Sequence, residues 1–163
     1  MPDIPAHFLY PGTVFAPPVP HRVTTVLGSC VAVCLWDRKA GVGGINHFMI
    51  PLWNGEGLST PRYGNIALDR LLDGMLRLGC RRESLIAKVF GGSALWSNSS
   101  GLLAVGERNV ELARQTLREQ GIPILSSQVG GDVGRKIIFN TGTGEVMLRR
   151  SPPARPSAPA SFP

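Results

Sequence analysis

Cys30 and His47 are the two side chains of this sequence best suited to covalent chemistry. A cysteine becomes a strong nucleophile when a neighbouring group takes its proton, and imidazole is the side chain best matched to that task near neutral pH. The other two histidines, His7 and His21, lie in a first stretch rich in proline, so His47 is the candidate base within the body of the fold. The pair predicts a cysteine-dependent enzyme.

Each of these residues also has a plainer interpretation. A lone cysteine on a β-rich segment usually behaves as a small buried hydrophobe. We interpret Cys34 as a core residue of that kind and Cys80 as structural, at the end of a helix. The residue types alone therefore leave a structural role open for Cys30 as well.

Three cysteines and His47 would be enough ligands for a zinc ion, but their spacing matches no compact ligand motif, and zinc would consume the thiolate needed for attack. Residues 130–136 resemble a phosphate-binding loop only superficially, because Arg135 and Ile137 stand where such a loop needs other residue types. We expect no metal and no cofactor.

Composition indicates one globular domain in a chain of 163 residues with 43% apolar content. Irregular cysteine spacing and the absence of a leader pattern predict a reduced, cytoplasmic protein, and no apolar run approaches the ~20 residues of a membrane span. We expect a monomer with no membrane insertion. Residues 1–20 are predicted to be a proline-rich arm that cannot pair regularly, 21–150 the folded domain, and 151–163 a disordered Pro/Ser/Ala tail.

The net charge of +6 would attract an acidic partner without specifying which one. A basic nucleic-acid-binding module is one alternative to an enzyme. It would need aromatic side chains interleaved with the arginines, whereas aromatics make up only 7% of the chain and interleave poorly. We therefore expect no nucleic-acid partner.

The elements that must position Cys30 and His47 follow from hydrophobic periodicity and turn residues. Residues 30–37 are apolar and β-rich, and we favour a strand there over a buried helical turn. Apolar residues at helical spacing predict two helices, with Gly79 able to end the first in a left-handed conformation. Strands on both sides of the helices indicate an α/β or α+β sheet protein. The predicted strands are 22–27, 30–37, 45–50, 85–90, 122–129, 135–140 and 145–149, and the predicted helices are 63–78 and 107–120.

Six segments of the chain stand out together: 27–35 (LGSCVAVCL), 43–51 (GGINHFMIP), 62–64 (RYG), 87–92 (AKVFGG), 106–109 (GERN) and 130–136 (GGDVGRK). Each segment alone would be weak evidence. In this order, covering nearly all of residues 21–150, they resemble the chemoreceptor glutamine deamidase family, CheD, and the combined signal is specific.

This resemblance implies hydrolysis of glutamine side chains, to glutamate and ammonia, on the cytoplasmic helical region of methyl-accepting chemotaxis receptors. It implies a mixed β-sandwich with flanking helices, similar to the cytotoxic necrotizing factor deamidase domains, and a CheC-type phosphatase as a regulatory partner. Carried over by position, the nucleophile is Cys30, the base is His47, and Thr24 orients the imidazole. Thr25 would then point to the opposite face of its strand.

Backbone N–H groups at Gly28 and Ser29 are the expected donors for the oxyanion, because glycine lets the backbone approach a substrate closely. The reaction we expect proceeds through a thioester on Cys30 that His47 helps to form and to hydrolyse. A non-catalytic chemotaxis adaptor with the same fold is the remaining alternative. The matched pair of nucleophile and base argues against it.

Overall fold

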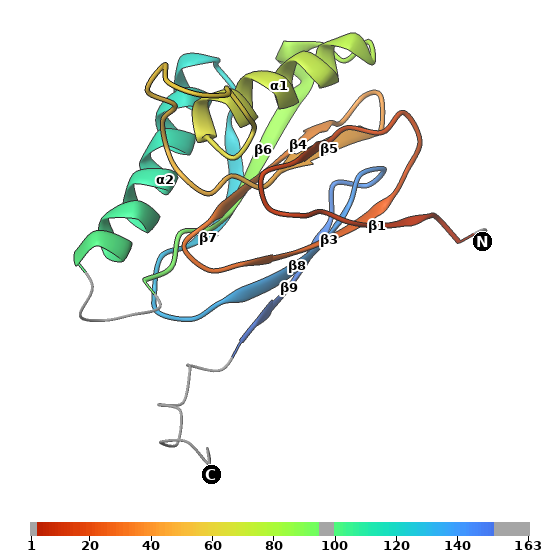
Figure 1. The fold of residues 1–163 in the computed structure, drawn as a ribbon. Coiled ribbons are helices and arrows are strands. Elements are labelled where there is room, and N and C mark those ends of the chain that lie inside the picture. Colours follow the sequence, from red (N-terminus) through yellow and green to blue (C-terminus); the bar gives the residue numbers. More distant parts are fainter. Residues whose placement is uncertain (1–2, 95–99, 152–163) are drawn as a thin grey trace.

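Two β-sheets and two α-helices stack in three layers (Figure 1). The computed structural model describes residues 3–94 and 100–151, the side chains of 100–104 excepted. Helices α1 (Gly64–Arg77) and α2 (Ser100–Glu119) cover one face of a five-stranded sheet, whose other face packs on a four-stranded sheet. The expected α+β class with a β-sandwich core and flanking helices is confirmed.

Both sheets are mixed. The pairs β1/β3 and β6/β7 are parallel and the other pairs are antiparallel. The four-stranded sheet has the order β1 (Ala6–Phe8), β3 (Arg22–Leu27), β8 (Arg135–Asn140), β9 (Val146–Arg150). The five-stranded sheet has the order β2 (Val14–Phe15), β5 (Val42–Asn46), β4 (Val31–Asp37), β6 (Leu85–Gly91), β7 (Ile124–Val129), and a short 3₁₀ helix, η1 (Arg82–Ser84), precedes β6.

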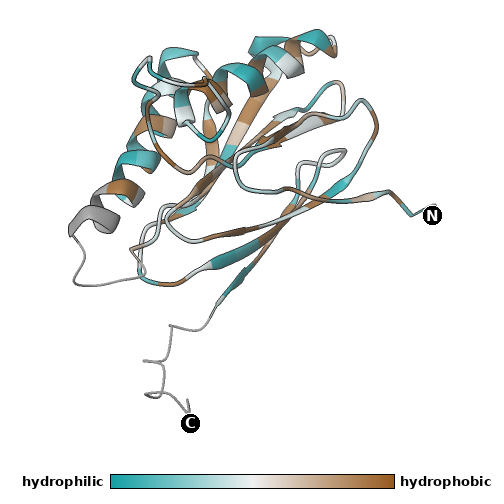
Figure 2. Cartoon of the chain, viewed as in Figure 1, coloured by the Kyte–Doolittle hydropathy of each residue, from teal (hydrophilic) through white to brown (hydrophobic). Residues whose placement is uncertain are grey.

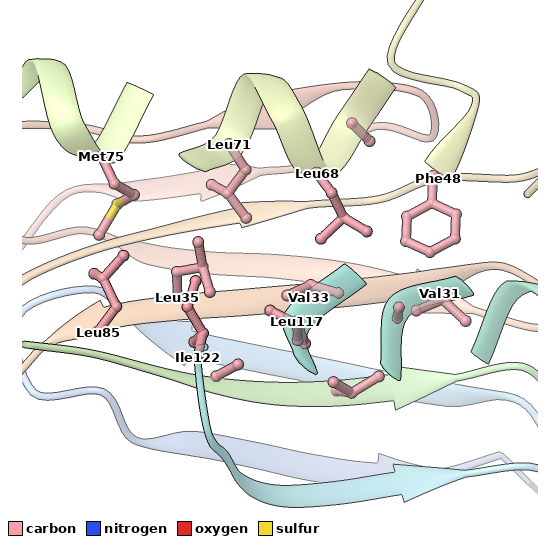
Figure 3. Packing of buried hydrophobic residues seen from close by; sticks show 14 of the residues in the cluster. Val31, Val33, Leu35, Phe48, Leu68, Leu71, Met75, Leu85, Leu117 and Ile122 are labelled. Atoms are coloured by element: carbon pink, nitrogen blue, oxygen red, sulfur yellow. The ribbon is translucent and has the colours of Figure 1, made fainter. Parts of the chain in front are cut away.

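Strand β4 lies near the middle of the five-stranded sheet and buries both of its faces. Val31, Val33 and Leu35 point to the helices, where Figure 3 shows them packed with residues of α1 and α2. Ala32 and Cys34 alternate with them and belong to a second apolar cluster between the two sheets. Burial on both faces explains why this segment is apolar as far as Trp36, and the strand favoured over a helical turn is confirmed.

The two helices contribute the apolar stripes that their spacing predicted. Ala67, Leu71 and Met75 of α1 are fully buried, and Figure 3 shows Leu71 and Met75 in the core. Helix α1 is followed by Gly79, whose φ of +90° is the predicted left-handed stop. The outer surface of the helices carries hydrophilic residues (Figure 2), so that each helix buries one side only.

Three predictions need correction. The N-terminal prolines do not prevent regular pairing: β1 and β2 are short enough to fit between them and pair with β3 and β5. The strand expected at 45–50 is Val42–Asn46, and its Gly44 lets α1 approach closely, because a Cβ there would lie 2.8 Å from the Leu71 side chain. Helix α2 begins at Ser100 rather than at 107. Of the predicted tail, residues 152–163 lie outside the described residues.

Candidate active site

Cys30 lies in the tight turn through which the chain passes from β3 of one sheet to β4 of the other. Gly28 and Ser29 precede it in that turn, and its thiol is free and half-buried against the apolar cluster between the sheets. Its carbonyl oxygen accepts a hydrogen bond of 2.8 Å from the Gly92 N–H. A Cβ on the adjacent Gly91 would collide with that oxygen, so the end of β6 needs glycine to support the turn.

The strand register brings Cys30 and His47 to the same face of the five-stranded sheet. Val31 and Phe48 pair directly, exchanging N–H···O bonds of 3.1 and 2.9 Å, and continue the register of β4 with β5. Since both of these side chains point to the helices, Cys30 and His47 point to the opposite side, between the sheets. They are diagonal neighbours across the pair, a spacing of about 7–8 Å that an imidazole can reach across.

His47 is 1% exposed, and a hydroxyl of the opposite sheet orients its ring. Its Nδ1 lies 2.7 Å from the Oγ1 of Thr25, which is fully buried on β3. The Thr25 hydroxyl in turn donates to the Leu9 carbonyl at 2.8 Å. A hydroxyl has one proton, and this one goes to Leu9, so Thr25 Oγ1 must accept the proton on His47 Nδ1.

The tautomer that follows has the form a general base needs. With the proton on Nδ1, the lone pair of His47 lies on Nε2, and Nε2 is buried with no hydrogen-bond partner among the described residues. This nitrogen belongs to a ring on the same face as the Cys30 thiol. The arrangement leaves one buried acceptor available for one thiol proton.

The predicted role of Thr24 is wrong in this structure, and the neighbouring threonine occupies the position. Side chains of β3 alternate, so that Val23, Thr25 and Leu27 are buried between the sheets while Thr24 is half-buried on the other face. Thr24 pairs with Ile138 of β8 and cannot reach His47. The threonine that contacts the imidazole is Thr25, because the alternation of β3 places Thr24 on the other face.

Burial leaves both groups of the pair neutral near pH 7. It lowers the pKa of His47 to about 4, because a buried imidazolium loses its hydration. Burial also raises the pKa of the Cys30 thiol above its ordinary value, an effect that the cysteine's own N–H partly offsets. The resting site therefore holds a thiol and an imidazole rather than a preformed ion pair.

Asn109 of α2 is a buried polar residue beside the site, and it is the last residue of the motif 106–109, whose Arg108 and Asn109 we expected only to serve the start of the second helix. Its side-chain amide donates to the carbonyls of Ser29 at 3.0 Å and Met49 at 3.1 Å, and it is fully buried. Ser29 precedes Cys30 in the chain, and Met49 lies opposite Cys30 in the strand register. Asn109 shares a helix face with Ala113, and a polar residue on an apolar stripe is the signal that could have revealed it.

Arg135 supports the Cys30 turn from the other side. Its guanidinium is buried and donates to the carbonyls of Gly91 and Gly130 and to the Ser93 hydroxyl. The Ser93 N–H donates to the Gly28 carbonyl at 2.9 Å. The N–H groups of Gly28 and Ser29 donate to no described residue, and the N–H of Cys30 interacts with its own thiol.

Within the described ranges, no three histidine, cysteine or carboxylate side chains come together in a way that could hold a metal ion. The same part of the chain contains no helix with the length and apolar character to cross a bilayer.

Comparison with known proteins gives consistent matches. Residues 49–150 match the family described as CheD chemotactic sensory transduction. A protein of Trichlorobacter lovleyi is 57% identical over 144 residues, 88% of this chain and 89% of the relative. Proteins of Sulfurimonas denitrificans (43% identical; 87% of this chain, 92% of the relative) and Rhodospirillum rubrum (47%; 90% and 83%) are also similar. All three carry the name Probable chemoreceptor glutamine deamidase CheD.

The depressed pKa of His47 makes the stability of the fold depend on pH. The unfolded imidazole binds a proton below about 6.5 and the folded one only below about 4, so stability is fully present above pH 6.5 and falls as the pH drops toward 4. We expect wild type to lose about 3 kcal/mol more than His47→Gln between pH 7 and pH 4. Urea unfolding of both proteins at the two pH values measures this. Equal losses in the two proteins would contradict the buried, neutral imidazole.

Proposed function

The chain belongs to the CheD family, and from this membership we propose that it is a chemoreceptor glutamine deamidase that uses Cys30 as nucleophile and His47 as base. The observation that carries the proposal is the bond from His47 Nδ1 to Thr25, because it leaves Nε2 as a proton acceptor on the face shared with Cys30. An amide is a poor electrophile, so both a strong nucleophile and a proton for the departing amine are needed.

The reaction begins when the glutamine side chain reaches the half-buried thiol. His47 Nε2 takes the Sγ proton, the thiolate attacks the amide carbon, and the imidazolium returns the proton to the leaving ammonia. The resulting thioester is hydrolysed by a water that His47 deprotonates, which frees glutamate and the thiol. Because both groups are neutral at rest, the charge separation develops only with substrate in place.

The oxyanion of each tetrahedral intermediate needs donors arranged in advance. We propose the backbone N–H groups at Gly28 and Ser29 and that of Cys30 itself. Their support is that the Gly28 and Ser29 N–H groups donate to no described residue and the Cys30 N–H lies at its own sulfur, while the carbonyls of Gly28 and Ser29 are held by Ser93 and Asn109. A rigid turn costs no reorganisation when the charge forms.

The family resemblance supports the finer parts of the proposal. The substrate is the cytoplasmic helical region of methyl-accepting chemotaxis receptors, and the enzyme acts in the cytoplasm as a monomer. A CheC-type phosphatase regulates it by docking.

Deamidation itself is tested with a purified chemoreceptor cytoplasmic fragment. We expect wild type to release ammonia and to convert specific glutamines to glutamate, as read by peptide mass mapping, and Cys30→Ala and His47→Ala to lose at least about 10³-fold in rate. Release that persists in Cys30→Ala would refute the thiol mechanism. A wild type that binds the fragment without releasing ammonia would favour the adaptor.

Thr25 acts through His47 and is a positioning residue. Thr25→Val removes the acceptor of the Nδ1 proton and allows the other tautomer, in which Nε2 carries the proton and cannot act as base. We expect kcat to fall by roughly 10-fold to 100-fold with KM unchanged, and Thr25→Ser, which keeps the hydroxyl, to retain most of it. Imidazole ¹⁵N shifts report the tautomer directly. An unchanged tautomer and kcat in Thr25→Val would remove Thr25 from the mechanism.

Asn109 is a second positioning residue, because it ties the backbone before Cys30 to the backbone after His47. Asn109→Asp replaces its two donors by acceptors that face carbonyl oxygens. We expect a loss in kcat on the order of 10²-fold and slower alkylation of Cys30 by iodoacetamide. The control is Leu117→Ala, which removes a buried side chain of the same helix and should cost stability only. If Cys30 is alkylated at the same rate in Asn109→Asp and in Leu117→Ala, Asn109 contributes to packing only and does not position the site.

A further inference from the structure

The outer face of the four-stranded sheet is uncovered by any described element. Both helices lie on the other sheet, at the opposite side of the sandwich (Figure 1). Strands β3 and β8 bury alternate residues against the second sheet and leave the residues between them on this outer face. Two of those residues, Val26 and Ile138, are apolar, and Val26 is 52% exposed. Exposed apolar side chains gathered on one face are typical of surfaces that bind another molecule.

A row of mostly apolar side chains crosses all four strands of this face. The register aligns Phe8 with Thr24, Thr24 with Ile138, and Ile138 with Met147. Phe8 is 45% exposed and Met147 is 70% exposed. Three strand spacings make the row roughly 14 Å long, which corresponds to between two and three turns of an α-helix.

Cations lie on both sides of the row. The adjacent row on the side of the Cys30 turn consists of Val26, Lys136 and Arg149. The adjacent row on the side away from that turn contains Arg22. Ile138 and Met147 line a hollow of about 160 Å³ together with Lys136 and Arg149. The four strands contain no aspartate or glutamate, and none of their basic residues joins an ion pair between described residues.

These charges select among the possible occupants. A second copy of the chain would bring the same cations to the contact and be repelled. Residues 152–163 contain Arg155 and no carboxylate, so they do not complement the face either. A nucleic-acid backbone would match the charge but would leave the apolar row without a partner. An amphipathic helix with acidic residues on both borders of its apolar stripe matches the row and the flanking cations together.

We propose that this outer face binds an acidic amphipathic helix of the polypeptide that carries the target glutamine. The proposal rests on the proposed function, and it deepens it by assigning the surface that recognises the substrate. Strand β3 links the two sites, because it runs from this face into the turn that carries Cys30. Lys136 and Arg149 lie at the end of the face nearer that turn, since Leu27 pairs with Arg135.

The test uses the full chain, with the chemoreceptor cytoplasmic fragment as substrate and Lys136→Glu/Arg149→Glu as the variant. We expect KM to rise at least tenfold, kcat to stay within twofold, and the salt dependence of KM to become weaker than in wild type. The matched control is Arg114→Glu/Arg118→Glu, the same charge change at exposed positions of α2, which should leave KM within twofold.

The possible failures are distinguishable. If wild type releases no ammonia, the proposed function fails before the docking surface is at issue. If wild type is active and the two double variants have the same KM, the docking proposal is overturned. Duplex DNA and anionic vesicles test for another anionic partner. If wild type binds one of them tightly, Lys136→Glu/Arg149→Glu loses that binding and KM for the fragment is unchanged, the docking proposal is overturned in favour of that partner. Alkylation of Cys30 by iodoacetamide, equal in all three proteins, verifies an intact site.

Discussion

The hydrogen-bond chain from His47 through Thr25 to Leu9 is the interaction on which the rest of the site depends. It crosses from one sheet of the sandwich to the other, so the imidazole is oriented only when the two sheets are packed together. Because the threonine proton is already given to a carbonyl, the chain has a direction, and that direction decides which imidazole nitrogen can accept a proton. A buried hydroxyl thus supplies the orienting role without a full charge.

Burial of the same groups has a second consequence. A carboxylate partner would stabilise imidazolium, whereas Thr25 in an apolar setting leaves the pKa of His47 lowered and that of Cys30 raised. A neutral thiol is a poor target for oxidants and stray electrophiles, since reactivity follows the thiolate. The candidate site therefore holds a neutral thiol beside an imidazole that is unprotonated near neutral pH.

The two sheets of the sandwich differ in what covers their outer faces. The helices cover the five-stranded sheet, and from that side Asn109 reaches the backbone on either side of the Cys30–His47 pair. From the end of the other sheet, Arg135 holds the glycine-rich segments against the turn. The outer face of the four-stranded sheet packs against no described element, and its cations flank an apolar row rather than pairing with carboxylates.

Local pattern determined most of the elements and singled out Cys30 and His47 as the candidate pair. The strands at Arg22–Leu27 and Arg135–Asn140 and the helix around Leu71 follow from alternation and helical spacing, and six ordered motifs indicated the family. Three features depend on contacts between distant segments and were not predictable from the sequence. They are the pairing of β1 and β2, the contact of His47 with Thr25 rather than Thr24, and the hydrogen bonds of Asn109 to Ser29 and Met49. A one-residue change of phase moves a side chain to the other face of a strand. Only the packing of the second sheet decided which threonine meets the imidazole.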